Sequence, residues 1–152
     1  MYRIIIQRVV PKEAIPLNTH LKYWAIAALK TKINSAELTI RIVDKKEMTE
    51  LNSRYRHKSK ATNVLSFPFE IPKEVKMKIP LLGDIVICAD VVNLEANMQG
   101  KPSNAHWAHM IVHGTLHLLG YDHIKEDDAI LMESQEMTIL NSLGFANPYQ
   151  TK

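Results

Sequence analysis

Three histidines in the last third of the chain constrain its fold more than any other feature. His113 and His117 are four residues apart, and His123 follows six residues later, with Gly120 between them. Two residues four apart on a helix project from one face, and a glycine permits the sharp turn that brings a third residue back. Imidazoles that converge in this way form a metal site. The run therefore predicts a helix that ends at Gly120, followed by a tight return.

The spacing is that of the long zinc-protease motif H-E-x-x-H-x-x-G-x-x-H, but Gly114 stands where the motif has glutamate. That glutamate is the general base of the proteases, and glycine has no side chain that could replace it. Three neutral nitrogen ligands favour zinc and leave a position open for water, as in catalytic sites. Zinc lowers the pKa of bound water to about 7, so a hydroxide nucleophile is still available. The motif thus predicts one zinc ion on a zincin-like helix, without the protease base.

Other histidines compete for this role. His106, His109, His113 and His117 fall within an arc of about 80° on one helix face. His109 and His117 lie about 12 Å apart along the axis, whereas a zinc ion sits only about 2.1 Å from each nitrogen, so they cannot share an ion. His109 and His113 could chelate, but this pair lacks the turn and the returning histidine. We therefore predict His113, His117 and His123 as the ligands.

Two neighbouring residues have several possible roles. His109 lies one turn before His113 and either supports a ligand or the substrate, or packs in the core beside Trp107. Asp122 could ligate weakly, orient His123, accept a proton from metal-bound water, or cap the turn. The sequence shows no fourth protein ligand.

Length and composition fit one globular domain, residues 1–152. The chain has 152 residues, of which 46% are hydrophobic and 23% charged. No run approaches the ~18 apolar residues of a membrane helix, and residues 1–10 are too charged for a secretory signal. Cys88 is the only cysteine and lies in an apolar stretch, which predicts a buried thiol. We expect a cytoplasmic protein with no membrane partner.

The hydrophobic pattern predicts an α+β fold. We expect strands at 2–10, 37–43, 63–69 and 82–89, and helices at 17–30, 44–55, 91–99, 103–120 and 126–144. The sheet should be mixed and mostly parallel, with about four strands packed against about five helices. Pro68 cannot donate to a ladder, so its strand should be an antiparallel edge strand that can line a substrate groove. Residues 71–80 should form a mobile loop. The expected helix N-caps are Asp44, Asp90 and Ser103.

Charge is divided unevenly along the chain. Residues 1–80 carry 16 Lys+Arg against 7 Asp+Glu, a net of +9, whereas residues 81–152 carry 3 against 9, a net of −6. The densest basic run, residues 54–60, has four positive charges and no acid. Such a run alone is more often a solvated loop. Beside a zinc site, however, Arg54 and Arg56 offer planar guanidinium groups that bind phosphate oxygens, which favours a nucleic-acid backbone over a peptide.

Four segments together resemble the YbeY family of bacterial endoribonucleases: Tyr55-Arg56, Ala61 to Phe69, Leu82 to Ile87 and His113 to His123. The resemblance covers about residues 37–149. It implies zinc-dependent, single-strand-specific RNA cleavage in the cytoplasm, used in maturation of the small-subunit ribosomal RNA 3′ end and in ribosome quality control. The implied partners are single-stranded RNA, the small ribosomal subunit and assembly proteins. The resemblance also implies that His113, His117 and His123 are the metal ligands and that Arg56 is the functional arginine.

Two other functions fit parts of the pattern. A metalloprotease-like amide hydrolase would share the histidine spacing, although Gly114 argues against it. A non-enzymatic ribosome-assembly factor would share the ligands but use the zinc structurally. For RNA cleavage, the attacking oxygen is either water or the ribose 2′-hydroxyl, and Asp122 is the candidate general base if there is one. The pattern predicts no particular oligomeric state.

Overall fold

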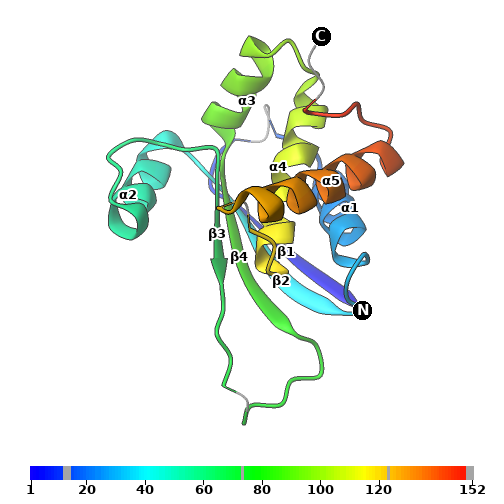
Figure 1. Cartoon of the computed structure of the whole chain (residues 1–152). Coiled ribbons are helices and arrows are strands. Elements are labelled where there is room, and N and C mark those ends of the chain that lie inside the picture. Colours follow the sequence, from blue (N-terminus) through cyan, green and yellow to red (C-terminus); the bar gives the residue numbers. More distant parts are fainter. Residues whose placement is uncertain (12–14, 73, 123, 150–152) are drawn as a thin grey trace.

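The computed structural model describes residues 1–11, 15–72, 74–122 and 124–149. In chain order, the elements are β1 (Tyr2–Arg8), α1 (Asn18–Leu29), β2 (Ala36–Val43), α2 (Lys45–Arg56), β3 (Val64–Pro68), β4 (Leu81–Cys88), α3 (Ala89–Met98), α4 (Ser103–Leu118) and α5 (Glu126–Ser142). This order confirms the predicted α+β class, with four strands and five helices in the described part of the chain (Figure 1).

The sheet has the strand order β1-β2-β4-β3. The pairs β1–β2 and β2–β4 are parallel, whereas β3 and β4 are antiparallel. The sheet is therefore mixed and mostly parallel, as predicted. Pro68 is the last residue of β3, which is the edge strand. A proline is tolerated there because an edge strand can lack a ladder donor without breaking the sheet.

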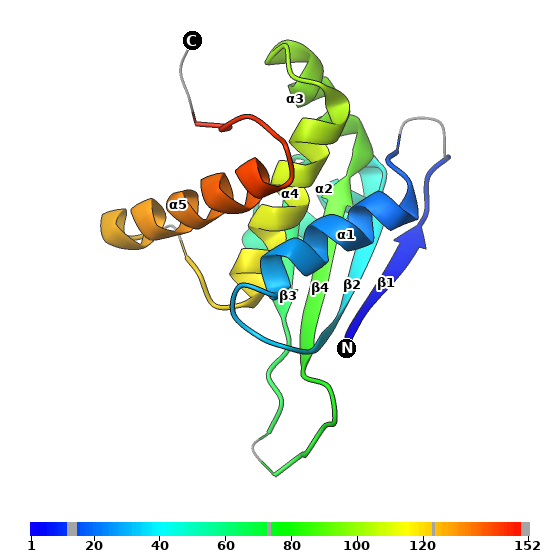
Figure 2. The same cartoon turned by 90° about the vertical axis from the view of Figure 1, so that its right-hand side faces the viewer.

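Helices cover the two faces of the sheet unequally. In Figure 2, α1 and α4 lie side by side over one face, and α2 lies behind the sheet on the other. Successive side chains of β4 point to opposite faces of the sheet, and both faces are buried, which explains why the strand is apolar throughout. Ile85 and Ile87 belong to the main core under α1 and α4, whereas Val86 and Cys88 belong to a smaller core with Met48 of α2. Cys88 is buried, as predicted, and burial raises the pKa of its thiol.

Two predicted helix caps are wrong. β4 passes directly into α3, so Cys88 is the N-cap and Asp90 lies in the first turn. Pro102 is the N-cap of α4, and the Ser103 hydroxyl instead donates to Asn93 Oδ1, at 3.3 Å. Asp44 does cap α2, because its Oδ1 accepts from the Glu47 amide at 2.9 Å. Asp90 still contributes a negative charge to the first turn of α3, where the helix dipole favours it.

Residues 69–72 and 74–80, between β3 and β4, extend away from the rest of the molecule (Figure 1). The described part of this connection has no helix or strand, as the prediction of a loop requires. None of the helices that the structure describes is long and apolar enough to cross a membrane.

Candidate metal centre

Gly114 allows α4 to pack closely against the edge of the sheet. A Cβ atom at this position would lie 2.9 Å from Ile85 Cγ2 and 3.3 Å from Ser66 Oγ. The Ser66 hydroxyl donates to the Gly114 carbonyl oxygen at 3.0 Å, which fastens α4 to β3. A glutamate side chain would have no room here. The substitution of glutamate by glycine therefore has a packing cause in addition to its chemical consequence.

His113 and His117 face each other on α4. Their Nε2 atoms are 3.2 Å apart. Two nitrogens bound to one tetrahedral zinc ion, each at about 2.0–2.1 Å, are separated by about 3.3–3.4 Å. The pair therefore has the separation that two ligands of one zinc ion require.

The chain turns after α4 as the glycine predicted. Gly120 has φ +102°, a conformation that residues with a Cβ rarely adopt. The Tyr121 amide donates to the Leu116 carbonyl at 3.0 Å and closes the helix end. Asp122 Oδ1 then accepts from the Ile124 amide at 3.2 Å, so turn capping is one role that this side chain fulfils. His123, the third predicted ligand, lies outside the described residues.

A buried carboxylate from α5 organises the histidines of α4. Glu136 has no exposed surface. Its Oε1 lies 2.6 Å from His113 Nδ1, and its Oε2 lies 2.8 Å from His109 Nε2. The Tyr149 hydroxyl also donates to Oε2. Of the two roles proposed for His109, support of a ligand is the one these contacts favour, since it holds the carboxylate that contacts His113.

Electrostatics keep Glu136 ionised. Burial raises the pKa of this carboxyl, but the hydrogen bonds with His109 and His113 outweigh burial and lower the pKa to about 2, from an ordinary value of 4.5. Burial, with the hydrogen bond to Glu136, raises the pKa of Tyr149. An ionised carboxylate only accepts hydrogen bonds, so His113 Nδ1 carries the proton and its Nε2 presents a lone pair toward His117.

Sequence reasoning missed Glu136, although the signal was present. The buried positions of α5 are Met132, Glu136, Ile139 and Leu140. They are spaced at i, i+4, i+7 and i+8, which is the core-facing stripe of a helix. An acid within such a stripe requires a buried partner, and a histidine-rich helix is the obvious source of one.

A second group of possible ligands shares His113 with the predicted set. One potential ligand atom each from His109, His113 and Glu136 lies within 4.8 Å of the other two. The structure thus offers two arrangements around His113. In one, His113 and His117 would hold the metal; in the other, His109, His113 and Glu136 would hold it.

A cleft of about 430 Å³ opens on the His117 side. His113 and His117 form part of its wall, Arg56 lies on another part, and residues 62–66 of the β3 edge line it between them. Asp122 and Ile124 complete the rim. Three of the four predicted site residues therefore meet around one cleft, and the edge strand lines this groove as expected.

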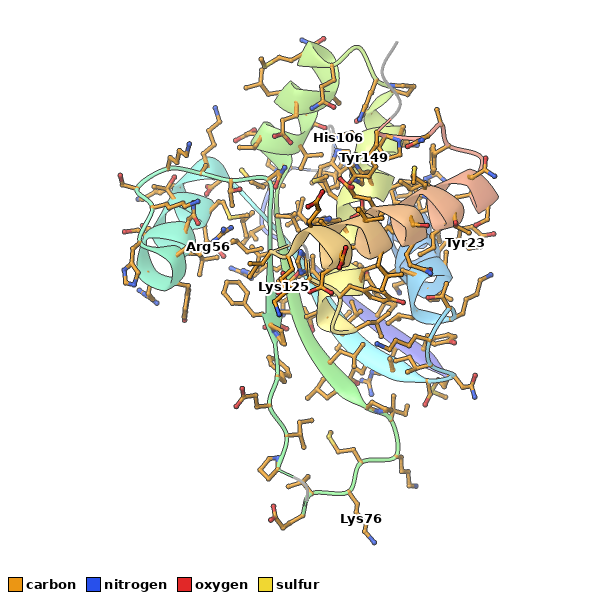
Figure 3. All side chains as sticks on the ribbon, in the orientation of Figure 1. Tyr23, Arg56, Lys76, His106, Lys125 and Tyr149 are labelled. Atoms are coloured by element: carbon orange, nitrogen blue, oxygen red, sulfur yellow. The ribbon has the colours of Figure 1, made fainter. Side chains whose placement is uncertain are left out.

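Arg56 is positioned by the end of α2 (Figure 3). His57 terminates the helix in the left-handed conformation, with φ 57°. The buried side chain of Asn52 then donates through Nδ2 to the Lys60 carbonyl oxygen at 2.7 Å. These contacts fix the backbone of the basic run, so its cations are presented from the last turn of α2 and from a loop of defined conformation.

Comparison with known proteins decides the family. The family model described as Endoribonuclease YbeY matches residues 11–144. This chain belongs to the YbeY family. It is 53% identical over 146 residues to the Endoribonuclease YbeY of Nitrosococcus oceani, and the match covers 96% of this chain and 95% of that protein. The resemblance noted in the sequence is thereby confirmed, and the YbeY enzymes are hydrolases of phosphodiester bonds.

The fold is also similar to a solved structure. The solution structure of TM1509 from Thermotoga maritima matches with a TM-score of 0.60 and 22% sequence identity, over 99% of this chain and 100% of that one. At this identity, the likeness concerns the fold alone. It supports the α+β fold of this chain.

Proposed function

We propose that this YbeY-family protein is a zinc-dependent endoribonuclease that cleaves single-stranded RNA, with residues 1–152 forming one metal-dependent hydrolase domain. One observation carries the proposal. The facing Nε2 atoms of His113 and His117, 3.2 Å apart, lie in the same cleft as Arg56. Two metal-binding histidines beside an arginine suit a substrate whose reacting centre is an anionic phosphate.

The proposed ligands are His113, His117 and His123. His113 and His117 border the cleft, whereas Glu136 is completely buried and His109 nearly so. A catalytic metal needs a position open to water or substrate, which the cleft provides and the buried group does not. Glu136 acts instead as the hydrogen-bond acceptor that fixes the ring of His113, a common arrangement behind zinc-bound histidines.

Each side chain then has a distinct task. Bound zinc supplies a Lewis acid and lowers the pKa of a water molecule. Arg56 binds non-bridging phosphate oxygens and offsets the negative charge that grows on them during cleavage. Asp122, an exposed residue that lines the cleft, is the candidate proton acceptor. The protease alternative is disfavoured, because the position of its general base is occupied by a glycine with no space for a side chain.

The biological substrate proposed is ribosomal RNA. The relative in Nitrosococcus oceani is named an endoribonuclease, and the basic half of the chain contributes Arg56 and the β3 edge to the cleft. We propose maturation of the small-subunit ribosomal RNA 3′ end and ribosome quality control as the roles. The partners are the small subunit and its assembly proteins, in the cytoplasm.

The activity is tested with purified protein and a single-stranded RNA. Cleavage should require zinc, stop with a chelator, and be abolished by His113→Ala and His117→Ala, whereas Asp128→Asn, an exposed acid on α5, should cleave normally. Cleavage that is unchanged by chelator and by both histidine variants would contradict the proposal. Zinc binding with a large loss of melting temperature on removal, but no turnover, would favour an assembly factor with structural zinc.

The ligand set is tested separately by zinc content. The predicted set requires His117→Ala to lose zinc and His109→Ala to retain most of it. The opposite result would assign the ion to His109, His113 and Glu136. Elemental analysis after dialysis against a weak chelator, with circular dichroism as a check of folding, distinguishes the two.

A further inference from the structure

Tyr55 is an exposed aromatic residue directly before Arg56. Its side chain is 57% exposed although it lies on a helix that packs against the sheet. The ring contacts Phe67 edge to face, with centroids 5.1 Å apart and planes at 66°. Phe67 packs against the smaller core and so holds the Tyr55 ring in place. Tyr55 itself belongs to neither core. An aromatic ring held in place yet open to solvent suits the stacking of a ligand.

The two faces of β3 separate this ring from the metal cleft. Ser66 contacts Gly114 of α4 and lines the cleft. Phe67 packs against the smaller core that includes Leu65 and Met48 of α2, although Leu65 also borders the cleft. Phe69, 41% exposed, follows Phe67 just after the strand. We call Tyr55, Phe67 and Phe69 the aromatic strip; within it, Tyr55 and Phe67 are in direct contact, and Phe67 does not line the cleft.

Charge around the aromatic strip suits a nucleic-acid backbone. Residues 54–60 contain no acid and carry Arg54 and Arg56 in the last turn of α2, and Lys58 and Lys60 in the loop that Asn52 fixes. Two acids lie beside the other aromatic residues: Asp84 is the ladder partner of Phe67, and Glu70 directly follows Phe69. Phosphates are therefore favoured along the basic run, on the α2 side of Tyr55.

We propose that Tyr55, supported by Phe67, stacks the base of a nucleotide adjacent to the cleaved phosphodiester, while the basic run binds the backbone. The inference rests on the proposed endoribonuclease function and names a substrate-binding subsite for it. A single strand can bend around the β3 edge and turn a base onto the ring. A duplex cannot, because its bases are already stacked and paired. The subsite would therefore contribute to preference for single strands.

The test measures RNA binding by the full chain in chelator, where cleavage is prevented. Fluorescence anisotropy is recorded with a labelled single-stranded RNA and with a set carrying one abasic ribose at each position in turn. For the wild type, one abasic position should weaken Kd by about 5- to 150-fold, the range for loss of one base stacked on an aromatic ring. Tyr55→Ala should weaken binding of intact RNA comparably and remove the sensitivity to that position. Tyr55→Phe should bind as the wild type does.

The matched control is Tyr23→Ala. Tyr23 is 62% exposed on α1 and lies on the other side of the molecule from Arg56 (Figure 3), so its variant should bind RNA normally. If Tyr55→Ala binds intact RNA like the wild type, or keeps the same sensitivity to the abasic position, the proposed subsite is wrong. RNA cleavage by the wild type would still support the proposed function. If the wild type neither binds nor cleaves single-stranded RNA, the proposed function fails as well.

Discussion

His113 Nδ1 lies 2.6 Å from Oε1 of Glu136, a carboxylate with no exposed surface. The contact joins helices that are separated in sequence by the return after Gly120, and it decides which nitrogen of His113 faces the cleft. Because the same carboxylate also contacts His109 and Tyr149, its position is fixed from three sides. The orientation of His113 therefore depends on residues that do not touch the cleft.

Glu136→Gln should weaken zinc binding by about 10- to 100-fold, the usual cost of losing a carboxylate behind a metal-bound histidine. The amide is nearly the same size, so the protein should fold, but it holds the proton on His113 Nδ1 less firmly. Competition with a zinc-binding dye measures the affinity. Asp128→Asn removes an exposed acid from the same helix and should bind zinc normally. Equal affinity in the two variants would contradict the orienting role.

The stability of the metal-free protein should fall at acid pH through Glu136. Its pKa is about 2 in the folded protein and 4.5 ordinarily, so the unfolded chain takes up the proton first as the pH falls. The contribution is fully present above about pH 4.5 and is lost as the pH falls toward 2. Urea unfolding at a series of pH values should show a flatter profile for Glu136→Gln than for the wild type. Parallel profiles would show that the carboxylate does not contribute.

The parts of the structure that follow from local chemistry could be predicted from the sequence. The helix with the facing histidines follows from the four-residue spacing, and the turn follows from a glycine with φ +102°. Pro68 placed β3 at the sheet edge because of its missing donor. The family resemblance placed Arg56 with the histidines, and the fold brings it to the same cleft as His113 and His117.

The parts that depend on packing between distant segments could not be predicted in this way. Glu136 meets His113 only because α5 lies over α4, and the helical pattern of α5 does not specify which helix it covers. Asp90 and Ser103 have good capping chemistry, but the direct passage from β4 into α3 and the position of Pro102 shift both helix starts. The sequence shows that Gly114 has no side chain, whereas its close approach to Ile85 arises only from the packing of α4 against the sheet.

Gly114→Ala should destabilise the protein. The added methyl would lie 2.9 Å from Ile85 Cγ2, a branched side chain in the core. Overpacking costs about 1–3 kcal/mol, offset by about 1 kcal/mol from the higher helix propensity of alanine. We expect a net loss of up to about 2 kcal/mol by urea unfolding. The loss should shrink in an Ile85→Ala background, where the obstructing methyl is absent; an unchanged loss would place the strain elsewhere.

Arg56 should affect turnover, and Arg54 should affect only binding. Arg56 lines the cleft with the histidines, whereas Arg54 is exposed outside it, on the same turn of α2. If Arg56 binds the phosphate in the transition state, Arg56→Ala should lower kcat by about 10²- to 10³-fold, and Arg56→Lys should restore little, because an ammonium group lacks the planar fork. Arg54→Ala should raise KM, more so at low salt, and leave kcat unchanged. Single-turnover cleavage of a fluorescent single-stranded RNA, with zinc content measured for each variant, separates the effects. A kcat for Arg56→Ala close to that of Arg54→Ala would show that Arg56 has no role in the chemical step and only contributes charge to the basic run.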